Sequence, residues 1–312
     1  HLRRMGSSGT WLSYPAIALF RNYNGKTRLV WMFPMSANLV EGSYFQPLQS
    51  RLMQLGPNTA LGMFLSPWRG FEDVRKLITE YYESAHDCIA ASDFSSTDAH
   101  FQLAASLEVY DVIKDCFQEQ YREGLLQSIQ HMHSIPLVIN ADSKIVGEHG
   151  VSSGSNWTNF IETIFDLIFA AYVSQSTAYS GLYAIGDDMS WVTDAEHYDE
   201  SFSSDLEKLG EECGQVIKAE KTTNDRDKVK SLQRLFQRGY LVPETKLVRA
   251  VYPTVRALKS LVYPERMHKK RLWNKDMSSI RSLMILENCC DHPLFESFVK
   301  FVAAGDVSVS DE

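Results

Sequence analysis

Short apolar stretches, one of them alternating with polar residues, predict β-strands in the first two thirds of the chain. The clearest are residues 26–33, 88–93, 181–185 and 189–192. The first alternates basic and apolar side chains and stops at Pro34, and the last two flank Gly186-Asp187-Asp188. Glycine and aspartate favour tight turns, so the pattern predicts a β-hairpin with two adjacent acids at its tip.

Longer segments between the strands carry apolar residues at helical spacing. We expect helices over 38–55, 70–83, much of 99–130, from the Ser-Gly segment at 150–156 to about residue 172, over 202–210, and beyond Pro243 with breaks at Pro253 and Pro264. Further strands are expected as a pair near 136–147, over 214–222 and over 229–238, whereas 11–20 fits either a strand or a short helix. The first ten residues are polar and predict a loop. This mixture of elements indicates the α+β class.

The composition is that of a globular protein and argues against a disordered chain or a small disulfide-stabilised module. Of 312 residues, 44% are hydrophobic and 22% charged, which permits one large domain or two to three subdomains. No apolar run reaches the roughly 20 residues that cross a bilayer, and the first residues lack a signal-peptide core, so we expect a soluble intracellular protein. Because the chain begins with His1, we expect it to be part of a longer protein.

The cysteines give little support to a metal or redox centre. None of the five lies in a Cys-x-x-Cys pair, so we expect reduced, buried thiols. Cys289-Cys290-Asp291-His292 resembles half of a metal site, but no second half with matching spacing follows.

Basic residues are unevenly distributed although the formal net charge is −8. The first 40 residues contain no Asp or Glu, and between Lys246 and Lys275 the only acid is Glu265. On the predicted strand 26–33, alternation places Lys26 and Arg28 on one face, where they could bind a triphosphate. The alternative interpretation is an edge strand that charge protects from pairing.

Carboxylates recur at the ends of the predicted strands. An isolated Asp187-Asp188 pair is more typical of a solvated turn, but keeping both ionised when partly buried costs free energy unless a cation lies between them. Asp93 ends the strand 88–93 and supplies a third carboxylate, which we expect to face Asp187 from a neighbouring strand. Asp98 follows five residues later and either lines the same crevice or caps the next helix.

The helix after the Ser-Gly segment carries a polar face. Thr158, Glu162 and Asp166 are spaced four residues apart and therefore share that face, which in most helices is simply solvated. The segment before it contains Ser153 and Gly154, which would let a loop approach a ligand closely.

The order of these motifs resembles the palm of viral RNA-directed RNA polymerases. It runs from a basic strand through Asp-x4-Asp, a Ser-Gly-x3-Thr helix and a Gly-Asp-Asp hairpin to a lysine-ended strand. The sequence around the motifs resembles most closely that of the double-stranded-RNA partitivirus polymerases, at residues 27–31, 150–155, 252–258, 263–266 and 292–296. The chain differs from the family pattern at Thr97, Ser152 and Glu162, where an aromatic residue, proline and asparagine are common.

The resemblance implies a right-hand polymerase fold, with an antiparallel central palm sheet flanked by helices and with helical fingers and thumb portions. It implies fingers over 1–85, palm over 86–240 with a fingers insertion at about 99–149, and the start of the thumb over 241–312. Asp93, Asp187 and Asp188 would hold Mg²⁺, with Mn²⁺ as the alternative ion.

The resemblance also implies roles in nucleotide binding. Lys26 and Arg28 would contact the triphosphate, Ser153 and Gly154 the template and nucleotide, and Asp98 with Thr158 the ribose 2′-hydroxyl. Glu162 and Asp166 would also lie beside the ribose, although both match the family pattern for ribose contacts less closely than Asp98 does. Lys221 would protonate pyrophosphate, with Lys218 as the alternative.

The expected activity is template-directed nucleotidyl transfer for replication and transcription of a viral double-stranded RNA genome. The expected partners are RNA template and product, nucleoside triphosphates and, as a candidate, the viral capsid protein, with no membrane. The expected location is the host cytoplasm, inside the virion. Two alternatives stay open, a reverse-transcriptase-like polymerase and a non-catalytic RNA-binding palm, which would bind RNA with a steep salt dependence.

Overall fold

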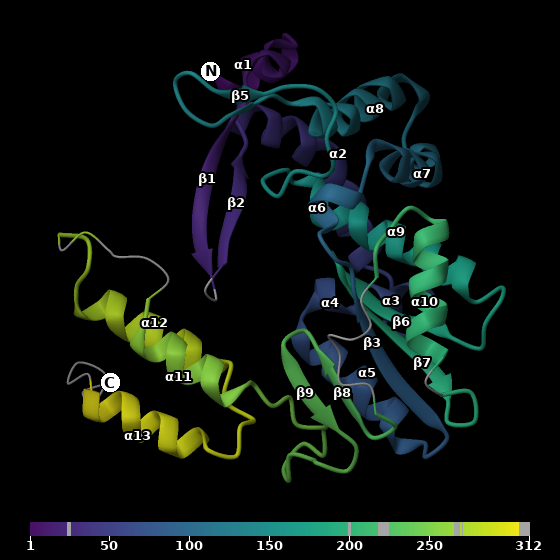
Figure 1. Ribbon diagram of the computed structural model, residues 1–312, viewed down its shortest axis with the longest axis vertical. Coiled ribbons are helices and arrows are strands. Elements are labelled where there is room, and N and C mark those ends of the chain that lie inside the picture. The colour runs from purple at the N-terminus through teal and green to yellow at the C-terminus, as the bar shows by residue number, and fades with distance from the viewer. Residues whose placement is uncertain (24–25, 199–200, 218–224, 265–268, 270, 306–312) are drawn as a thin grey trace.

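The computed structural model describes residues 1–23, 26–198, 201–217, 225–264, 269 and 271–305. Its central sheet has three antiparallel strands in the order β3-β7-β6, namely β3 Asp87–Asp93, β7 Asp188–Asp194 and β6 Ser180–Ile185. Strands β6 and β7 form the predicted hairpin, whose turn is Gly186 and Asp187. The three strands lie together in the lower right of the view (Figure 1), and Asp93 and Asp188 lie at one end of the sheet.

Helices cover both faces of the central sheet. Alternate residues of each strand point to opposite faces, so each strand contributes side chains to two cores. Ala90 packs into the core built around α9 (Trp157–Val173), whereas Ile89 and Ala91 pack into a second core with α5 (Phe71–Glu83). Burial on both faces explains why the strands are so apolar in sequence.

A second sheet lies apart from the first and supports the basic hairpin. Its strands run β2-β1-β4-β5, with β1 Ala16–Tyr23 and β2 Lys26–Met32 antiparallel, β4 Leu137–Val138 parallel to β1, and β5 Lys144–Ile145. The β1–β2 hairpin projects away from the body of the molecule (Figure 1), which leaves much of its surface exposed. The predicted strand at 26–33 is therefore confirmed.

Around these sheets lie α1 Leu2–Ser7, a 3₁₀ turn at Thr10–Ser13, α2 Met35–Met53, α3 Ala60–Phe64, α4 Ser66–Arg69, α6 Thr97–His100, α7 Leu103–Ile113, a 3₁₀ turn at Lys114–Cys116, α8 Glu119–Ser134 and α10 Ser201–Glu212. Helices α2, α7 and α8 lie at the same end of the molecule as the second sheet (Figure 1). The predicted helices at 38–55, 70–83, 157–172 and 202–210 are confirmed within a few residues.

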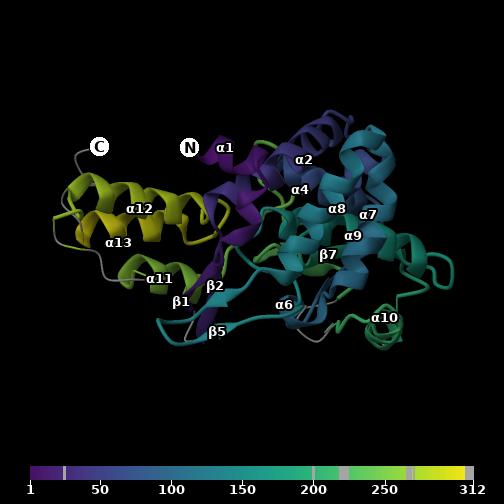
Figure 2. The ribbon, with the colours of Figure 1, turned by 90° about the horizontal axis from the view of Figure 1, so that it is seen from above.

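The C-terminal part consists of the hairpin β8 Lys228–Ser231 with β9 Arg234–Gln237 and of three helices, α11 Thr254–Val262, α12 Lys275–Glu287 and α13 Phe295–Gly305. The helices form a separate group beside the rest of the chain when the molecule is seen from above (Figure 2). Ala257, Leu286, Cys289, Phe298 and Val302 form their own small core.

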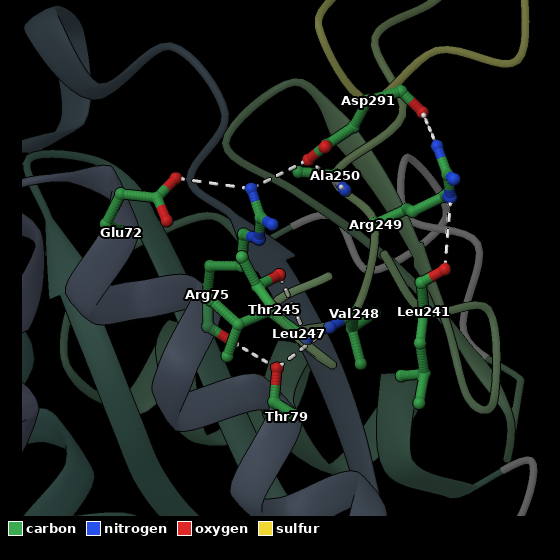
Figure 3. A network of polar contacts seen from close by, with 10 residues as sticks. All are labelled: Glu72, Arg75, Thr79, Leu241, Thr245, Leu247, Val248, Arg249, Ala250 and Asp291. Carbon is green, nitrogen blue, oxygen red and sulfur yellow. Dashed lines mark hydrogen bonds and ion pairs between the residues drawn. The ribbon is translucent and has the colours of Figure 1, made fainter. Parts of the chain in front are cut away.

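A buried ion pair joins the segment between α12 and α13 to α5, which packs against the central sheet (Figure 3). Arg75 of α5 donates from Nη1 to Oδ2 of Asp291 at 2.9 Å, and the same oxygen accepts the Ala250 backbone N–H at 3.1 Å. Arg249 donates to the Asp291 backbone carbonyl at 3.3 Å. His292 shares a hydrogen bond with Thr254 Oγ1 at 2.8 Å. Asp291 and His292, from the segment that resembles half of a metal site, therefore connect two parts of the fold.

Three expectations about secondary structure were wrong. Residues 2–7 form a helix instead of a loop. Residues 229–238 form a hairpin instead of one strand, because Leu232 and Gln233 adopt φ of 48° and 64° and turn the chain back. Residues 243–253 form no helix but turns and isolated bridges, so the helical part predicted after Pro243 begins only at Thr254. Of the strand predicted over 214–222, only 214–217 lie in the described part of the chain, where Ile217 forms a bridge with Phe94.

Candidate functional site

Three aspartates lie at one end of the central sheet. Asp93, the last residue of β3, lies directly opposite Asp188, the first residue of β7, and directly opposed residues project from the same face. Asp187 occupies the adjoining turn, where its backbone carbonyl accepts the Phe94 N–H at 3.4 Å. The expected partner of Asp93 was Asp187, and the register corrects this to Asp188. The turn contains only Gly186 and Asp187, so β7 begins at Asp188, one residue earlier than expected, and Asp188 takes the paired position.

A cavity of about 480 Å³ opens beside this tip. It brings together three parts of the chain and is lined by Thr97, Asp98, Ser153, Ser155, Thr158, Asn159, Glu162, Ile185, Gly186, Asp187 and Asp188. Asp98 lies in the first turn of α6, whose N-cap residue is Ser96, so it does not occupy the N-cap position that was its alternative role. The fold therefore gathers most of the predicted binding residues around one space.

A second, smaller cavity of about 170 Å³ shares Asp188 with the first. It is lined by Asp93 and Asp188 together with Lys230, Gln233 and Arg256 and several small or apolar residues. Arg256 Nη1 donates to Gln233 Oε1 at 2.6 Å. The sequence reasoning missed Lys230 and Arg256; Arg256 belongs to the basic run noticed after Lys246, whereas no pattern singled out Lys230.

The loop before α9 is pressed against the basic hairpin. A Cβ added to Gly154 would lie 1.6 Å from the Trp31 carbonyl oxygen, so only glycine fits there. Ser153 Oγ accepts the Trp31 backbone N–H at 3.3 Å, and Thr158 Oγ1 donates to the Ser152 carbonyl at 2.7 Å. Ser153 and Gly154 thus hold the loop beside β2, at the edge of the larger cavity.

The acidic turn is also fixed from α9. The Gly186 N–H, at a residue with φ of 59°, donates to Thr163 Oγ1 at 2.9 Å, and that hydroxyl donates to the Asn159 carbonyl at 2.6 Å. Asn159 Oδ1 in turn accepts from Trp68 Nε1 at 3.3 Å. Thr163 and Asn159 were not predicted, because a threonine within an apolar helix carries no signal of its tertiary partner.

The acids of α9 are strongly perturbed by their surroundings. Burial raises the pKa of the Glu162 carboxyl well above its usual range, and the charges of Asp187 and Asp98 raise it further. Burial also raises the pKa of Asp166, with Glu162, Asp187 and Asp188 adding to the shift. Asp166 is fully buried, and neither carboxylate oxygen has a hydrogen-bond partner among the described residues. Asp166 does not line the cavity but lies behind it, so the helical spacing placed it correctly on the face of Glu162 but not in contact with solvent.

Positive charge approaches the site from the β1–β2 hairpin. Desolvation and Asp187 raise the pKa of Asp98, and Arg28 opposes that shift, so the guanidinium acts on the cavity electrostatically. Lys26 and Arg28 are both exposed, and Arg28 lies directly opposite Arg21. Like charges opposed across two strands destabilise a hairpin unless an anion accompanies them. The predicted basic face therefore exists and includes Arg21, although neither Lys26 nor Arg28 is among the described residues that line the cavity.

The model of the family described as viral RNA-dependent RNA polymerase matches residues 23–288. The chain belongs to this family. A potential RNA-dependent RNA polymerase of human picobirnavirus (strain Human/Thailand/Hy005102/-) is 29% identical over 287 residues, which are 90% of this chain and 51% of that protein. An RNA-directed RNA polymerase of Cryptosporidium parvum virus 1 (strain KSU-1) is 25% identical over 150 residues, 48% of this chain and 28% of that one.

The solved structures agree with the family. The crystal structure of an insertion-loop deletion mutant of a human picobirnavirus RNA-dependent RNA polymerase superposes with a TM-score of 0.83 at 26% identity, covering 95% of this chain and 58% of that one. The predicted right-hand polymerase fold is confirmed, and the central sheet is its palm. The chain spans about half the length of the picobirnavirus protein. No helix in the described part of this polymerase-family chain is long and apolar enough to cross a membrane.

The palm acids fit a divalent cation by their chemistry. Among the described residues, no three His, Cys, Asp or Glu side chains are grouped closely enough to hold a metal ion by themselves. Mg²⁺ is commonly bound through one or two carboxylates together with substrate phosphates and water, so a complete protein cage is not required. The opposed Asp93 and Asp188, with Asp187 beside them, provide such a partial ligand set. The lysines predicted as general acids, Lys221 and Lys218, lie outside the described residues.

Proposed function

We propose that this chain forms the catalytic part of an RNA-directed RNA polymerase, which joins nucleoside triphosphates to the 3′-hydroxyl of RNA on a template. The observation that carries the proposal is the convergence of Asp187 and Asp188 with Asp98, Ser153 and Thr158 around one cavity, with Asp93 directly opposite Asp188. Family membership supports it. The picobirnavirus relative is named a potential RNA-dependent RNA polymerase, and this chain covers half of it.

The larger cavity suits an incoming nucleotide. Its acidic end would adjoin the α-phosphate, and Asp98 with Thr158 offers oxygen acceptors for the ribose hydroxyls. Thr158 already donates its hydroxyl proton to Ser152, so its oxygen is left to accept. Glu162 lies beside these groups with a raised pKa, and a protonated carboxyl there would donate a hydrogen bond instead of repelling the phosphates. Arg28, Lys26 and Arg21 would attract the triphosphate from the hairpin side.

The smaller cavity suits the end of the growing RNA strand. Lys230 and Arg256 provide two positive charges next to Asp93 and Asp188, which matches a phosphate placed close to an acidic catalytic centre. A 3′-hydroxyl held there and a nucleotide held in the larger cavity would approach one another across Asp188, which lines both. The arrangement thereby brings the two reacting groups together without moving the sheet.

Asp93, Asp187 and Asp188 would hold the divalent cations of a two-metal site, Mg²⁺ with Mn²⁺ as the alternative. Bound cations would lower the pKa of the attacking hydroxyl and neutralise charge on the phosphates. The three carboxylates orient the ligand oxygens from a rigid strand end and a tight turn, and Thr163 fixes that turn through Gly186.

Several finer assignments belong to the same proposal. They are a double-stranded RNA genome as the product replicated, membership of the partitivirus group, a capsid protein as partner, a site of action in the host cytoplasm within the virion, and Lys221 as the general acid. The boundaries of fingers, palm and thumb at 85/86 and 240/241 stay predictions as well. The motif-flanking segments at 252–258 and 263–266 support the partitivirus assignment, whereas the two curated relatives come from a picobirnavirus and a virus of Cryptosporidium.

The test is RNA synthesis by the full-length protein and by this chain, side by side, on a single-stranded RNA template with Mg²⁺ titrated from zero. We expect incorporation of ribonucleotides that requires the cation and is lost with a chelator. Preference for deoxyribonucleotides would instead indicate the reverse-transcriptase-like alternative. RNA binding that weakens steeply with salt, without synthesis by either protein, would indicate the non-catalytic palm and overturn the proposal.

A further inference from the structure

Glu41 is a buried acid that no sequence motif pointed to. It lies in α2 with none of its surface exposed, and it contacts the loop before α9, which is more than a hundred residues away in sequence. Its Oε1 accepts the Ser155 hydroxyl at 2.7 Å, and its Oε2 accepts the Asn156 backbone N–H at 2.8 Å. Both carboxylate oxygens are therefore committed to this one loop.

The contact replaces a helix cap. The first N–H groups of a helix lack partners within it, and Asn156, the N-cap residue of α9, makes no side-chain capping bond. Glu41 supplies the acceptor from another helix, and Ser155 Oγ, which donates to Glu41, also accepts the Trp157 N–H at 3.1 Å. Asn156 Nδ2 donates to the Asn38 carbonyl at 2.9 Å, again on α2. A negative charge at this end is also favoured by the helix dipole.

The loop is thereby held from two sides. On one side, Ser153 and Gly154 touch Trp31 of β2, the strand that carries Arg28. On the other side, Ser155 and Asn156 are bound by Glu41. Since Ser153, Ser155 and Thr158 line the larger cavity, any movement of the loop changes that wall of the cavity.

Stability alone is a poor explanation for an acid at this place. Burial raises the pKa of Glu41 to about 7, although the bonds from Ser155 and Asn156 oppose the shift. A buried carboxylate is costly to desolvate, so its two bonds to the loop point to a role beyond stability.

We propose that Glu41 is a positioning residue for nucleotide selection, which holds the loop 153–156 so that the cavity wall fits a ribonucleoside triphosphate. The inference rests on the proposed polymerase function. Glu41 does not touch the cavity, so it acts only through Ser155 and Asn156.

The experiment compares four variants in the full-length protein. Glu41→Ala removes both bonds, Glu41→Asp keeps the charge but withdraws it from the loop, and Glu41→Gln keeps an oxygen for the Asn156 N–H while its amide can donate to Ser155 Oγ. Ser128→Ala is the matched control, because it removes a buried bond from Trp157 Nε1 to Ser128 Oγ at the same end of α9 without touching the loop. The readouts are KM and kcat for ribonucleotides, the ratio of ribo- to deoxyribonucleotide incorporation, and hydrogen exchange of the loop amides.

We expect Glu41→Ala and Glu41→Asp to raise KM about tenfold, lower the incorporation ratio and speed exchange at residues 153–157. Glu41→Gln should stay within about threefold of the natural protein, and Ser128→Ala should change stability but neither KM nor the ratio. If Glu41→Ala fails to fold, Glu41→Asp decides alone. Natural KM, ratio and exchange in Glu41→Asp, or equal kinetic losses in Ser128→Ala, would overturn the proposal. Absence of synthesis by the natural protein would instead count against the polymerase function, and the exchange measurement would then decide about Glu41.

Discussion

Two buried aspartates in this molecule have opposite hydrogen-bonding surroundings. Asp291, at the junction between the palm and the C-terminal helices, bonds to Arg75 and to the Ala250 N–H. Asp166, behind the acidic turn, is fully buried, and in the part of the chain that the structure describes neither of its carboxylate oxygens has a hydrogen-bond partner. Burial raises the pKa of Asp166, and the nearby charges Glu162, Asp187 and Asp188 raise it further.

The comparison distinguishes an acid that stabilises the fold from acids whose surroundings suit ligand binding. At Asp291 the charge is matched, so the acid contributes to holding two parts of the fold in one orientation. Around the acidic turn negative charge accumulates, since Asp187 and Asp98 raise the pKa of Glu162, and Glu162, Asp187 and Asp188 raise that of Asp166. Such an accumulation is tolerable where cations bind, so the two regions should respond differently to loss of a carboxylate.

The largest expected effect is on activity, from Asp187→Asn. We expect Mg²⁺-dependent RNA synthesis to fall by at least about a thousandfold, because a neutral amide is a poor ligand for a hard cation. The urea midpoint should stay the same or rise, because one repelling charge is removed. Measuring synthesis and unfolding on the same preparation checks this, and a folded variant with full activity would remove the central assignment.

Next in size is the effect of Asp291→Ala on stability. Removing one partner leaves Arg75 buried with its charge uncompensated by that acid, so we expect a loss of about 3–5 kcal/mol in the free energy of unfolding. Urea denaturation measures it. Arg75→Met in the same background should recover part of the loss, and a change below about 1 kcal/mol would show that the pair does not fasten the junction.

A smaller effect with a defined pH dependence is expected for Asp166→Asn. Because the folded pKa is raised, the stability tied to this group is complete below the unfolded value of about 4 and is lost as pH rises through the folded pKa. In Asp166→Asn the side chain does not ionise, so this pH-dependent loss of stability does not occur. It should therefore differ little from the natural protein near pH 4 and gain about 1–3 kcal/mol on it toward pH 9.

Unfolding free energies of both proteins at several pH values across that range provide the check. A difference in unfolding free energy that does not grow with pH would mean that the pKa of Asp166 is not raised in the folded protein. Asp291→Asn serves as the comparison, since a matched carboxylate should not gain stability when it is neutralised.

The smallest expected effect is on selectivity, from Asp98→Ala. Loss of one hydrogen bond to a ribose hydroxyl should lower the discrimination between ribo- and deoxyribonucleotides by about tenfold, with the fold unchanged. Primer extension with each nucleotide type, competed in one reaction, gives the ratio. Unchanged discrimination would restrict Asp98 to a role at the start of α6.

Local sequence patterns predicted most of the palm. Gly186-Asp187 marks the turn, and the apolar runs before and after it are long enough to define β6 and β7 without any tertiary information. The same holds for the alternating strand β2 and for the Ser-Gly loop that opens α9. The errors at residues 2–7 and at the β8–β9 turn arose where the local signal was weak: Leu232 and Gln233 are not residues that favour positive φ, and their turn is stabilised by the pairing of the strands around it.

The sequence by itself determined which chemistry is present and in what order, because turns, strands and helical faces follow from neighbouring residues. Only the tertiary structure decided that Asp93 opposes Asp188, since register depends on how a turn is closed and on which face is buried. It also decided that Lys230 and Arg256 share a cavity with those acids and that Glu41 binds a loop more than a hundred residues away. Such contacts, and the pKa shifts that accompany them, depend on packing between segments that are distant in sequence. Neither segment contains a local pattern that identifies the other.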